Sequence, residues 1–311
     1  MAAPESSAPA RQATALPTRG EFDEEGYLVL HRDIAAGVAA GVIESGWAHF
    51  SQAGFAEGRA WLRRADPFAG VDRRISPRDA MFRGNADHYF DAGESALHCI
   101  ATAIGAARRP PSTIRRILDL PCGHGRVLRF LRQAYPGAEL VACDLDRDGV
   151  DFCAATFGAT GVYSRTDVEA IPLSGGFDLI WCGSLLTHLD AAQSAAFLAL
   201  FSRMLDDRGI LVFTTHGRRC ERELAAGTNR FGLEEAQARA LLLTYERSGF
   251  GYVDYRDTPG YGFSLMHPQF VTTHLLADPA WSLLGYHEAG WDKRQDAIAL
   301  QKNARRVGLG I

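Results

Sequence analysis

The sequence lacks any long apolar run, because its longest stretches are far shorter than the roughly 18–20 residues of a membrane-spanning helix. It also lacks an excess of basic side chains: 33 Lys and Arg stand against 37 Asp and Glu and leave a formal charge of −4. A broad nucleic-acid footprint needs such an excess. The start of the chain shows neither the basic nor the apolar segment of a secretory signal. We therefore expect a cytoplasmic protein that binds neither membranes nor nucleic acids.

Paired cysteines and metal-ligand spacings are lacking as well. The six cysteines form no CxxC pair, and most lie in apolar stretches such as VACDL and IWCGS, which is typical of buried free thiols. The segment DLDRDG, from Asp144 to Gly149, matches the opening of a calcium loop. The twelfth position of that loop requires a glutamate, and here it is Ala155. We expect no bound metal.

Beyond Ile114, short apolar runs alternate with amphipathic helical stretches. The runs are RILDL, ELVACDL, GVYSRTD, FDLIWCGS and GILVFTT, and between them lie RVLRFLRQAY, GVDFCAATFG and AAQSAAFLALFSRML. This alternation predicts an α/β fold with a doubly wound, mostly parallel sheet that is covered on both faces. Such sheets bind ligands beyond the carboxyl ends of their strands.

The chain divides by composition into three parts. Residues 1–20 are rich in Ala, Pro and Ser and predict a disordered tail. Residues 21–110 predict a mainly helical extension, with a short strand at EGYLVLHRDI and a helix from Tyr89 to Ala107. Residues 111–311 form the predicted core, with an insertion at 217–266 that contains a helix and two aromatic segments able to pair as a hairpin.

The ends of the predicted strands carry groups suited to a nucleoside. The first run ends in Asp119-Leu120-Pro121-Cys122-Gly123-His124-Gly125, which is neither GxGxxG nor a phosphate-binding P-loop. Its two glycines allow a sharp turn and a close approach of a ligand to the backbone. Asp144, at the end of the second run, can accept both hydroxyls of a ribose. Asp167 and Val168 follow the third run and suit an adenine.

With these motifs, the segment from Ile114 to about His216 resembles the class I S-adenosylmethionine-dependent methyltransferases. The resemblance implies S-adenosyl-L-methionine as cofactor and a seven-stranded sheet with an antiparallel C-terminal strand. It implies that Asp119 lies near the methionine amino group and that Pro121 replaces the family's first glycine. The residues expected to bind the cofactor are Asp119, Pro121, Cys122, Gly123, His124, Gly125, Asp144, Leu145, Asp167, Val168, Cys182 and Gly183.

Methyl transfer to a hydroxyl benefits from a general base, most often histidine. His188 and His216 follow the fourth and fifth runs, and Asp190 can orient His188. Histidines satisfied by backbone hydrogen bonds are the alternative. The candidate acceptor contacts are Tyr89, Tyr252, Tyr255, Tyr261 and Phe263, although the same aromatic side chains can instead form a packed core.

The sequence thus predicts a methyltransferase that methylates oxygen on a small molecule or sugar, in a secondary-metabolite or polysaccharide pathway. The acidic charge and the lack of an NPPY-like element after the fourth run favour such an acceptor over an adenine amino group. Two alternatives stay open: a nicotinamide-dependent oxidoreductase, and a donor-binding subunit without catalysis. The oligomeric state is open as well.

Overall fold

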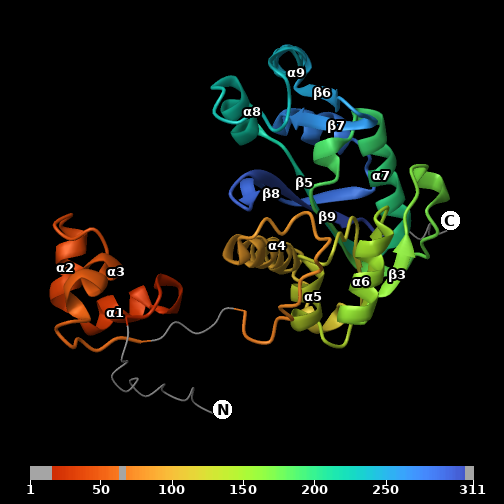
Figure 1. Cartoon of the computed structure of the whole chain (residues 1–311). Coiled ribbons are helices and arrows are strands. Elements are labelled where there is room, and N and C mark those ends of the chain that lie inside the picture. Colours follow the sequence, from red (N-terminus) through yellow and green to blue (C-terminus); the bar gives the residue numbers. More distant parts are fainter. Residues whose placement is uncertain (1–15, 63–67, 305–311) are drawn as a thin grey trace, which may run out of the picture. The chain divides into compact units, whose positions relative to one another are not determined.

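The computed structural model describes residues 16–62 and 68–304, so most of the predicted N-terminal tail lies outside the described residues. The chain divides into two compact units, residues 1–70 and residues 71–311 (Figure 1). Helix α4 (Ala86–Ala106), which confirms the helix predicted from Tyr89 to Ala107, belongs to the second unit. The division into an extension and a catalytic core near residue 110 stays a prediction.

The first unit is a small helical bundle around an aromatic core. Phe22, Tyr27, Phe50 and Trp61 are buried there, and Phe22 stacks on Phe50 with ring centres 4.7 Å apart. Its elements are η1 (Arg19–Glu21), α1 (Glu24–Leu30), α2 (Arg32–Ala39), α3 (Gly46–His49) and η2 (Phe50–Gly54).

The strand predicted at EGYLVLHRDI is wrong, because this segment forms α1 and α2. Asp23 caps α1 by accepting a hydrogen bond from the Gly26 amide. Tyr27 of α1 and Ile34 of α2 are buried in the same cluster, whereas Val29 is 77% exposed. Tertiary packing of these side chains overrides the strand preference of the YLVL run.

The second unit contains the predicted sheet, and the fold prediction is confirmed. Its strands follow the order β3-β2-β1-β4-β5-β9-β8, and all neighbours are parallel except β9, which is antiparallel to both β5 and β8. The strands are β1 (Arg116–Asp119), β2 (Glu139–Asp144), β3 (Thr160–Tyr163), β4 (Phe177–Cys182), β5 (Leu205–Thr215), β8 (Trp281–Trp291) and β9 (Gln295–Lys302).

Helices cover both faces of this sheet. Alternate strand residues face opposite cores: Ile117 packs with α4, α5 and α6, whereas its neighbour Leu118 packs with α7. The helical elements are α5 (Leu128–Ala134), α6 (Arg147–Phe157), α7 (Ala191–Met204), α10 (Pro268–Phe270), η3 (Pro111–Thr113), η4 (Val168–Ala170), η5 (Leu186–His188) and η6 (Val271–Leu275). No helix among the described residues is long and apolar enough to cross a membrane.

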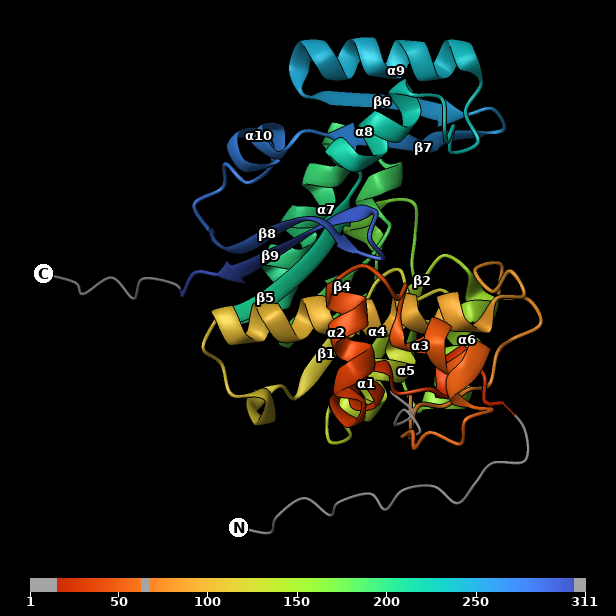
Figure 2. The same ribbon diagram turned by 90° about the vertical axis from the view of Figure 1, so that its left-hand side faces the viewer.

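The insertion after β5 forms a layer of its own. Strands β6 (Phe250–Tyr255) and β7 (Thr258–Met266) pair as the predicted antiparallel hairpin, and α9 (Glu235–Ser248) lies along it (Figure 2). Helix α8 (Arg218–Ala225) joins the same small core, in which Leu241 and Leu265 are fully buried. The Met266 amide donates to the His216 carbonyl at 2.8 Å, so the hairpin is fixed at the carboxyl end of β5.

Candidate functional site

Asp119 ends β1 as a buried carboxylate that lacks a hydrogen-bond partner. Its side chain is 1% exposed, and neither carboxylate oxygen has a partner among the described residues. Burial, and then the charge of Asp144, raise the pKa of Asp119 well above its usual value, while Arg126 opposes the shift. Buried charges are normally paired. An unpaired carboxylate at a ligand edge therefore points to a cationic ligand.

The loop after Asp119 has a shape that only its glycines allow. Gly123 and Gly125 have φ angles of +47° and +77°, and a Cβ on Gly125 would lie 2.4 Å from the Phe157 ring. His124 is buried within the loop, and its Nε2 lies 3.0 Å from an Asp148 carboxylate oxygen on α6. The buried Cys122 donates its amide to the Cys143 carbonyl of β2, and Pro121 is half-buried just before it. The loop is thus held against β2 and α6.

Asp144, at the end of β2, ties this loop to the neighbouring strand. One carboxylate oxygen accepts from the Gly123 amide at 2.8 Å, and the other accepts from the Asp146 amide at 2.9 Å. Each carboxylate oxygen has a further lone pair, so both can still accept a ribose hydroxyl. Burial raises the pKa of Asp144. Leu145, the next residue, is exposed and can cover a ligand from outside.

The ends of β3 and β4 place the other predicted cofactor residues at the same edge of the sheet. Asp119 pairs in register with Ala142 of β2 and with Trp181 of β4, so Cys182 and Gly183 follow beside it, both buried. Asp167 is exposed and accepts the Glu169 amide, and Val168 is half-buried. Among the described residues, no group of three or more His, Cys, Asp and Glu side chains can hold a metal ion.

His188 is held as a neutral base with one free ring nitrogen. Its Nδ1 lies 2.8 Å from the Gly262 carbonyl oxygen, which can only accept, so Nδ1 carries the proton and Nε2 carries the lone pair. Burial lowers the pKa of His188. The Tyr255 hydroxyl lies 3.3 Å from Nδ1, and the Tyr261 ring stacks on the imidazole with centres 4.8 Å apart. The hairpin thus orients His188.

Asp190 does not orient His188, contrary to the sequence-based expectation. Its carboxylate caps α7 by accepting from the Gln193 amide at 2.8 Å. An aspartate just before a helix fills this role because the first helical amides have no partner inside the helix. The orienting group is the Gly262 carbonyl, which comes from 74 residues further along the chain.

His216 lies deeper than His188, in aromatic surroundings. It is 5% exposed, stacks on Phe263 with ring centres 4.3 Å apart, and has Nδ1 3.2 Å from the Ser264 carbonyl oxygen. Burial, and then the charge of His188, lower the pKa of His216 to about 3. The two imidazole centres are 6.0 Å apart. His216 therefore packs edge-on against His188 from the more deeply buried side.

Two of the five candidate acceptor contacts, Tyr255 and Tyr261, meet at His188. Burial raises the pKa of Tyr261, and Asp144 adds to the shift, so this phenol lies within electrostatic range of the carboxylate at the end of β2. Tyr252 instead donates to Asp254 on its own strand, at 2.6 Å. Tyr89 is 1% exposed and donates to Asp79, and Phe263 is 1% exposed against His216.

Sequence reasoning missed a ring of hydrogen bonds beside this edge. The Ser184 amide donates to Thr214 Oγ1, Thr214 donates to Gln295 Oε1, and Gln295 Nε2 donates back to Ser184 Oγ. The ring fixes Ser184 at a φ of +61°, which is rare outside glycine. Sequence reasoning also did not single out Arg126, next to Gly125, whose guanidinium carbon lies 5.3 Å from the centre of the Trp291 ring.

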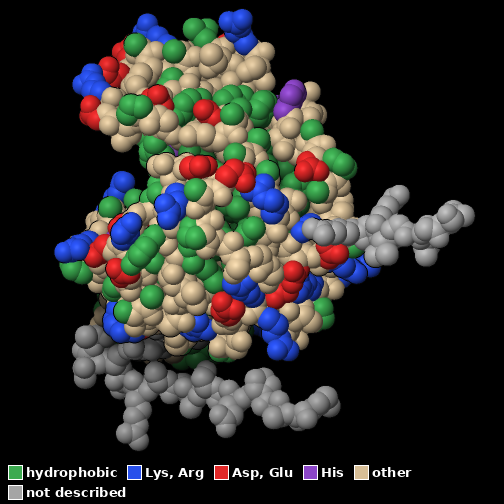
Figure 3. Space-filling view, turned by 90° about the vertical axis from the view of Figure 1, so that its right-hand side faces the viewer, with side chains coloured by type: hydrophobic (Ala, Val, Ile, Leu, Met, Phe, Trp, Pro, Cys, Tyr) green, Lys and Arg blue, Asp and Glu red, His purple; other side chains and the backbone are tan. Residues whose placement is uncertain are grey.

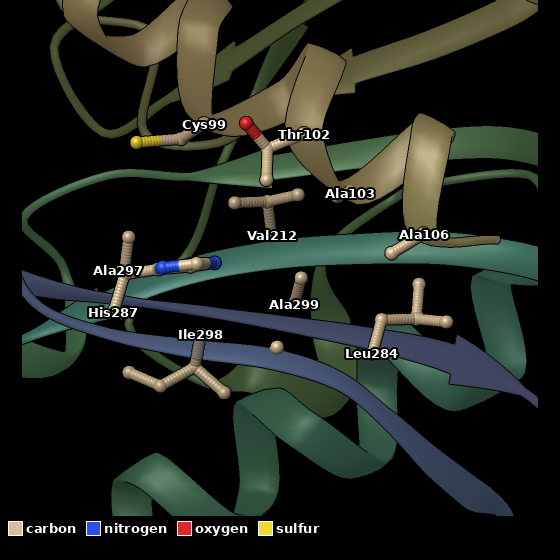
Figure 4. A pocket seen from close by; sticks show the side chains of 11 residues that line it. Cys99, Thr102, Ala103, Ala106, Val212, Leu284, His287, Ala297, Ile298 and Ala299 are labelled. Atoms are coloured by element: carbon tan, nitrogen blue, oxygen red, sulfur yellow. The ribbon is translucent and has the colours of Figure 1, made fainter.

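A small cavity lies between α4 and the sheet, away from Asp119 and Asp144. It holds about 30 Å³ and is lined by Cys99, Thr102, Val212, Leu284 and His287, among others (Figure 4). This volume suits one or two water molecules, not a nucleoside. We therefore assign the candidate site to the strand ends.

Comparisons with known proteins point to the same part of the chain. Residues 117–209 match the family model described as a methyltransferase domain. The chain is 37% identical over 137 residues to a malonyl-[acyl-carrier protein] O-methyltransferase of Enterobacter lignolyticus (strain SCF1), covering 44% of this chain and 52% of that protein. It is 31% identical over 155 residues to the protein of that name from Anoxybacillus flavithermus (strain DSM 21510 / WK1), covering 50% and 55%. The chain spans about half the length of the curated relatives it matches.

A solved S-adenosylmethionine-dependent methyltransferase from Clostridium acetobutylicum ATCC 824 aligns with a TM-score of 0.48 at 15% identity, over 73% of this chain and 96% of that one. The residues that match the family model run from β1 into β5 and include the Asp119 loop, Asp144 and Cys182. Residues 117–209 are thus similar to a methyltransferase domain, which agrees with the resemblance to class I S-adenosylmethionine-dependent methyltransferases that the sequence indicates.

Proposed function

We propose that this protein binds S-adenosylmethionine at the strand ends and transfers its methyl group to an oxygen of a small-molecule acceptor. The observation that carries the proposal is the Asp119 carboxylate, which is buried and unpaired on both oxygens. The ammonium group of the donor is a cation that fits such a partner. When bound, the sulfonium of the donor supplies an electrophilic methyl group.

The residues present fit the donor along its length. Asp119 would receive the ammonium group, and Asp144 would receive the ribose hydroxyls with the lone pairs that its two backbone donors leave free. Asp167 and Val168 would hold the adenine. The left-handed turns of the glycine loop, together with Cys182 and Gly183, keep side chains from blocking the methionine end. Aligning donor and acceptor in this way supplies much of the rate enhancement in a displacement reaction.

His188 is the group best placed to take the acceptor proton. His188 Nε2 would accept the proton of the acceptor hydroxyl, whose oxygen would take the methyl group that the donor's sulfonium supplies. The Gly262 carbonyl holds the other ring nitrogen protonated, and burial keeps the ring neutral and ready to accept. Tyr255 and Tyr261 form the wall beside it. We prefer His188 to His216 because His216 is the more deeply buried.

The acceptor class rests on charge and on the aromatic wall. On the face drawn in Figure 3, acidic and basic side chains are interspersed, which suits a small acceptor better than a polyanion. A sugar or secondary metabolite stacks well on tyrosines. A second candidate is a carboxylate on an acyl carrier, which the names of the curated relatives favour. A carboxylate is already ionised and needs no base, so the two acceptors differ in their dependence on His188.

The test combines calorimetry with a transfer assay. Adenosylmethionine and adenosylhomocysteine should bind, and NAD should not, whereas an oxidoreductase would show the reverse. Labelled donor should then methylate hydroxylated small molecules, sugars or malonyl carrier thioesters. Donor binding without transfer to any of them would support the non-catalytic subunit instead. A protein that binds neither adenosyl compound would refute the proposal.

The six cysteines are unpaired, which supports our proposal of a reducing, cytoplasmic location.

A further inference from the structure

Ser184, two residues after the end of β4, has a strained backbone. Its φ angle is +61°, a left-handed value that glycine adopts freely and that residues with a Cβ adopt rarely. Such a residue persists only where its surroundings hold it, and strained residues gather at functional sites. Ser184 lies between Cys182-Gly183, which we assign to the donor, and the turn η5, which ends at His188.

Three hydrogen bonds form a closed ring that holds Ser184 in this conformation. The Ser184 amide donates to Thr214 Oγ1 at 2.8 Å, Thr214 Oγ1 donates to Gln295 Oε1 at 2.6 Å, and Gln295 Nε2 donates to Ser184 Oγ at 3.0 Å. Each of the three residues therefore donates once and accepts once. Thr214 is fully buried on β5, and Gln295 begins β9, which pairs with β5. Because the bonds of such a ring polarise one another, the loss of one member weakens the others.

The other end of the segment from Ser184 to His188 is fixed by the hairpin. The Leu186 carbonyl accepts from Ser264 Oγ at 2.8 Å, and His188 Nδ1 lies 2.8 Å from the Gly262 carbonyl oxygen. The hydrogen-bond ring thus fixes the start of this short segment, and the hairpin fixes its end. A change of φ at Ser184 must therefore be absorbed between these two attachments, at the imidazole of His188 or close to it.

We propose that Gln295 is a positioning residue for methyl transfer, which holds Ser184 in its left-handed conformation and thereby sets the place of the His188 imidazole. Among residues 16–62 and 68–304, the polar atoms of the Gln295 side chain bond only within the hydrogen-bond ring. A base must lie within hydrogen-bond reach of the proton that it takes, and a displacement of about 1 Å can lower a rate about 100-fold. The inference rests on the proposed function and adds to it a residue that lies 111 positions beyond Ser184.

The test compares glycine with alanine in place of Ser184, and leucine in place of Gln295. Glycine takes a φ of +61° without strain, whereas alanine keeps the strain and loses the bond from Gln295. Ser184→Gly should therefore behave like the wild type, and Ser184→Ala should behave like Gln295→Leu. Adding Ser184→Gly to Gln295→Leu should restore most of what Gln295→Leu loses. Gln301→Leu is the matched control, because this half-buried glutamine lies near the other end of β9, where its Nε2 donates to the Arg208 carbonyl.

The first readout is NMR of the full chain with isotope-labelled histidine, which needs no acceptor. Signals of the His188 imidazole are identified by their absence from His188→Ala. Gln295→Leu and Ser184→Ala should shift them, and Ser184→Gly in the Gln295→Leu background should return them to their wild-type values. The signals of His124, in the glycine loop, should stay in place in all of these variants, and Gln301→Leu should move neither histidine.

The second readout is turnover of a hydroxylated acceptor from the transfer assay, beside calorimetry with adenosylhomocysteine. Gln295→Leu and Ser184→Ala should lower kcat about 10- to 100-fold, because the base is displaced, and should leave the adenosylhomocysteine affinity and the acceptor KM within about twofold of the wild type. Ser184→Gly and Gln301→Leu should keep kcat within about twofold. A role limited to supporting the sheet would not separate kcat from the two affinities in this way.

Each outcome supports or overturns the inference. Equal losses in Ser184→Gly and Ser184→Ala would assign the effect to the serine hydroxyl and overturn the positioning role. Wild-type kcat and unshifted His188 signals in Gln295→Leu would overturn it as well. If Gln295→Leu failed to fold, the comparison of glycine with alanine, which leaves Gln295 in place, would still decide. A wild-type protein that bound no adenosyl ligand would refute the proposed function, whereas the His188 signals would still report on the hydrogen-bond ring.

Discussion

Replacing Asp119 by asparagine should stabilise the donor-free protein and abolish donor binding. The carboxyl group is 1% exposed, and both of its oxygens lack partners, so ionising it in the folded protein places a negative charge in the interior without compensation. Asparagine has nearly the same shape and no charge. The change therefore removes the cost of ionising a buried group but also removes the partner that we assign to the donor's ammonium.

The magnitude follows from the pH dependence. Burial raises the pKa of Asp119 in the folded protein, whereas in the unfolded chain it is about 3.9. Between these two pKa values the folded protein holds a proton that the unfolded chain has lost. The free energy of unfolding of the wild type therefore falls by up to about 1.4 kcal/mol per pH unit as the pH rises through this window. The asparagine variant does not titrate at this position.

Thermal melts from pH 4 to pH 8 without donor provide the assay. The two proteins should have similar melting temperatures near pH 4. As the pH rises, the melting temperature of the variant should exceed that of the wild type by about 2–4 °C per kcal/mol of stability difference, until Asp119 is ionised. Adenosylhomocysteine should raise the melting temperature of the wild type alone. Asp257→Asn, at an exposed carboxylate between β6 and β7, is the control, and its melting temperature should stay parallel to that of the wild type with and without ligand. Parallel melting curves for Asp119→Asn and the wild type would refute the reasoning.

Three further predictions concern the neighbouring groups. Asp144→Ala should weaken donor binding at least about tenfold, measured by calorimetry, because the ribose contact and the bond from the Gly123 amide are both lost. His188→Ala should lower turnover of a hydroxyl acceptor by about 10²- to 10⁴-fold at unchanged donor affinity. The acid limb of the wild-type pH–rate profile should lie below pH 6.5, because burial lowers the pKa of His188. Equal turnover by His188→Ala and the wild type would favour a carboxylate acceptor. Tyr261→Phe should raise the acceptor KM, whereas Tyr252→Phe, whose hydroxyl is occupied by Asp254 on its own strand, should not.

The sequence predicts the sheet and its ligand edge well, because the information is local. The apolar runs that end at Asp119, Asp144 and Cys182 are short and continuous, and parallel strands bring their carboxyl ends to one edge whatever the loops do. A glycine loop with left-handed turns at Gly123 and Gly125 follows from the residue type alone. These features need no knowledge of distant contacts.

The parts that sequence reasoning missed depend on distant partners. Helix α1 forms because Tyr27 packs into an aromatic core that includes Phe50, although the local YLVL sequence favours a strand. In the sequence, Asp190 lies two residues after His188 and suggests an orienting carboxylate. In the structure, the Gly262 carbonyl orients His188, and Asp190 caps α7. No spacing rule connects residues that lie 74 positions apart. Distant contacts also explain why Tyr255 and Tyr261 lie against His188, whereas Tyr252 bonds to Asp254.

Two charged side chains that lack hydrogen-bond partners among the described residues, Asp119 and Arg126, lie at the strand edge where we propose that the donor binds. Asp119 and Arg126 are unpaired, while their neighbours Asp144, His124 and Arg129 are bonded to backbone or to other side chains and hold the loop in place. Pairing Asp119 with Arg126 would stabilise the empty protein, yet a ligand would then have to break that pair. Keeping them apart lowers stability without a ligand and adds the same free energy to binding. Donor affinity and the stability of the donor-free protein are therefore coupled through one loop, and a substitution there that improves one should weaken the other.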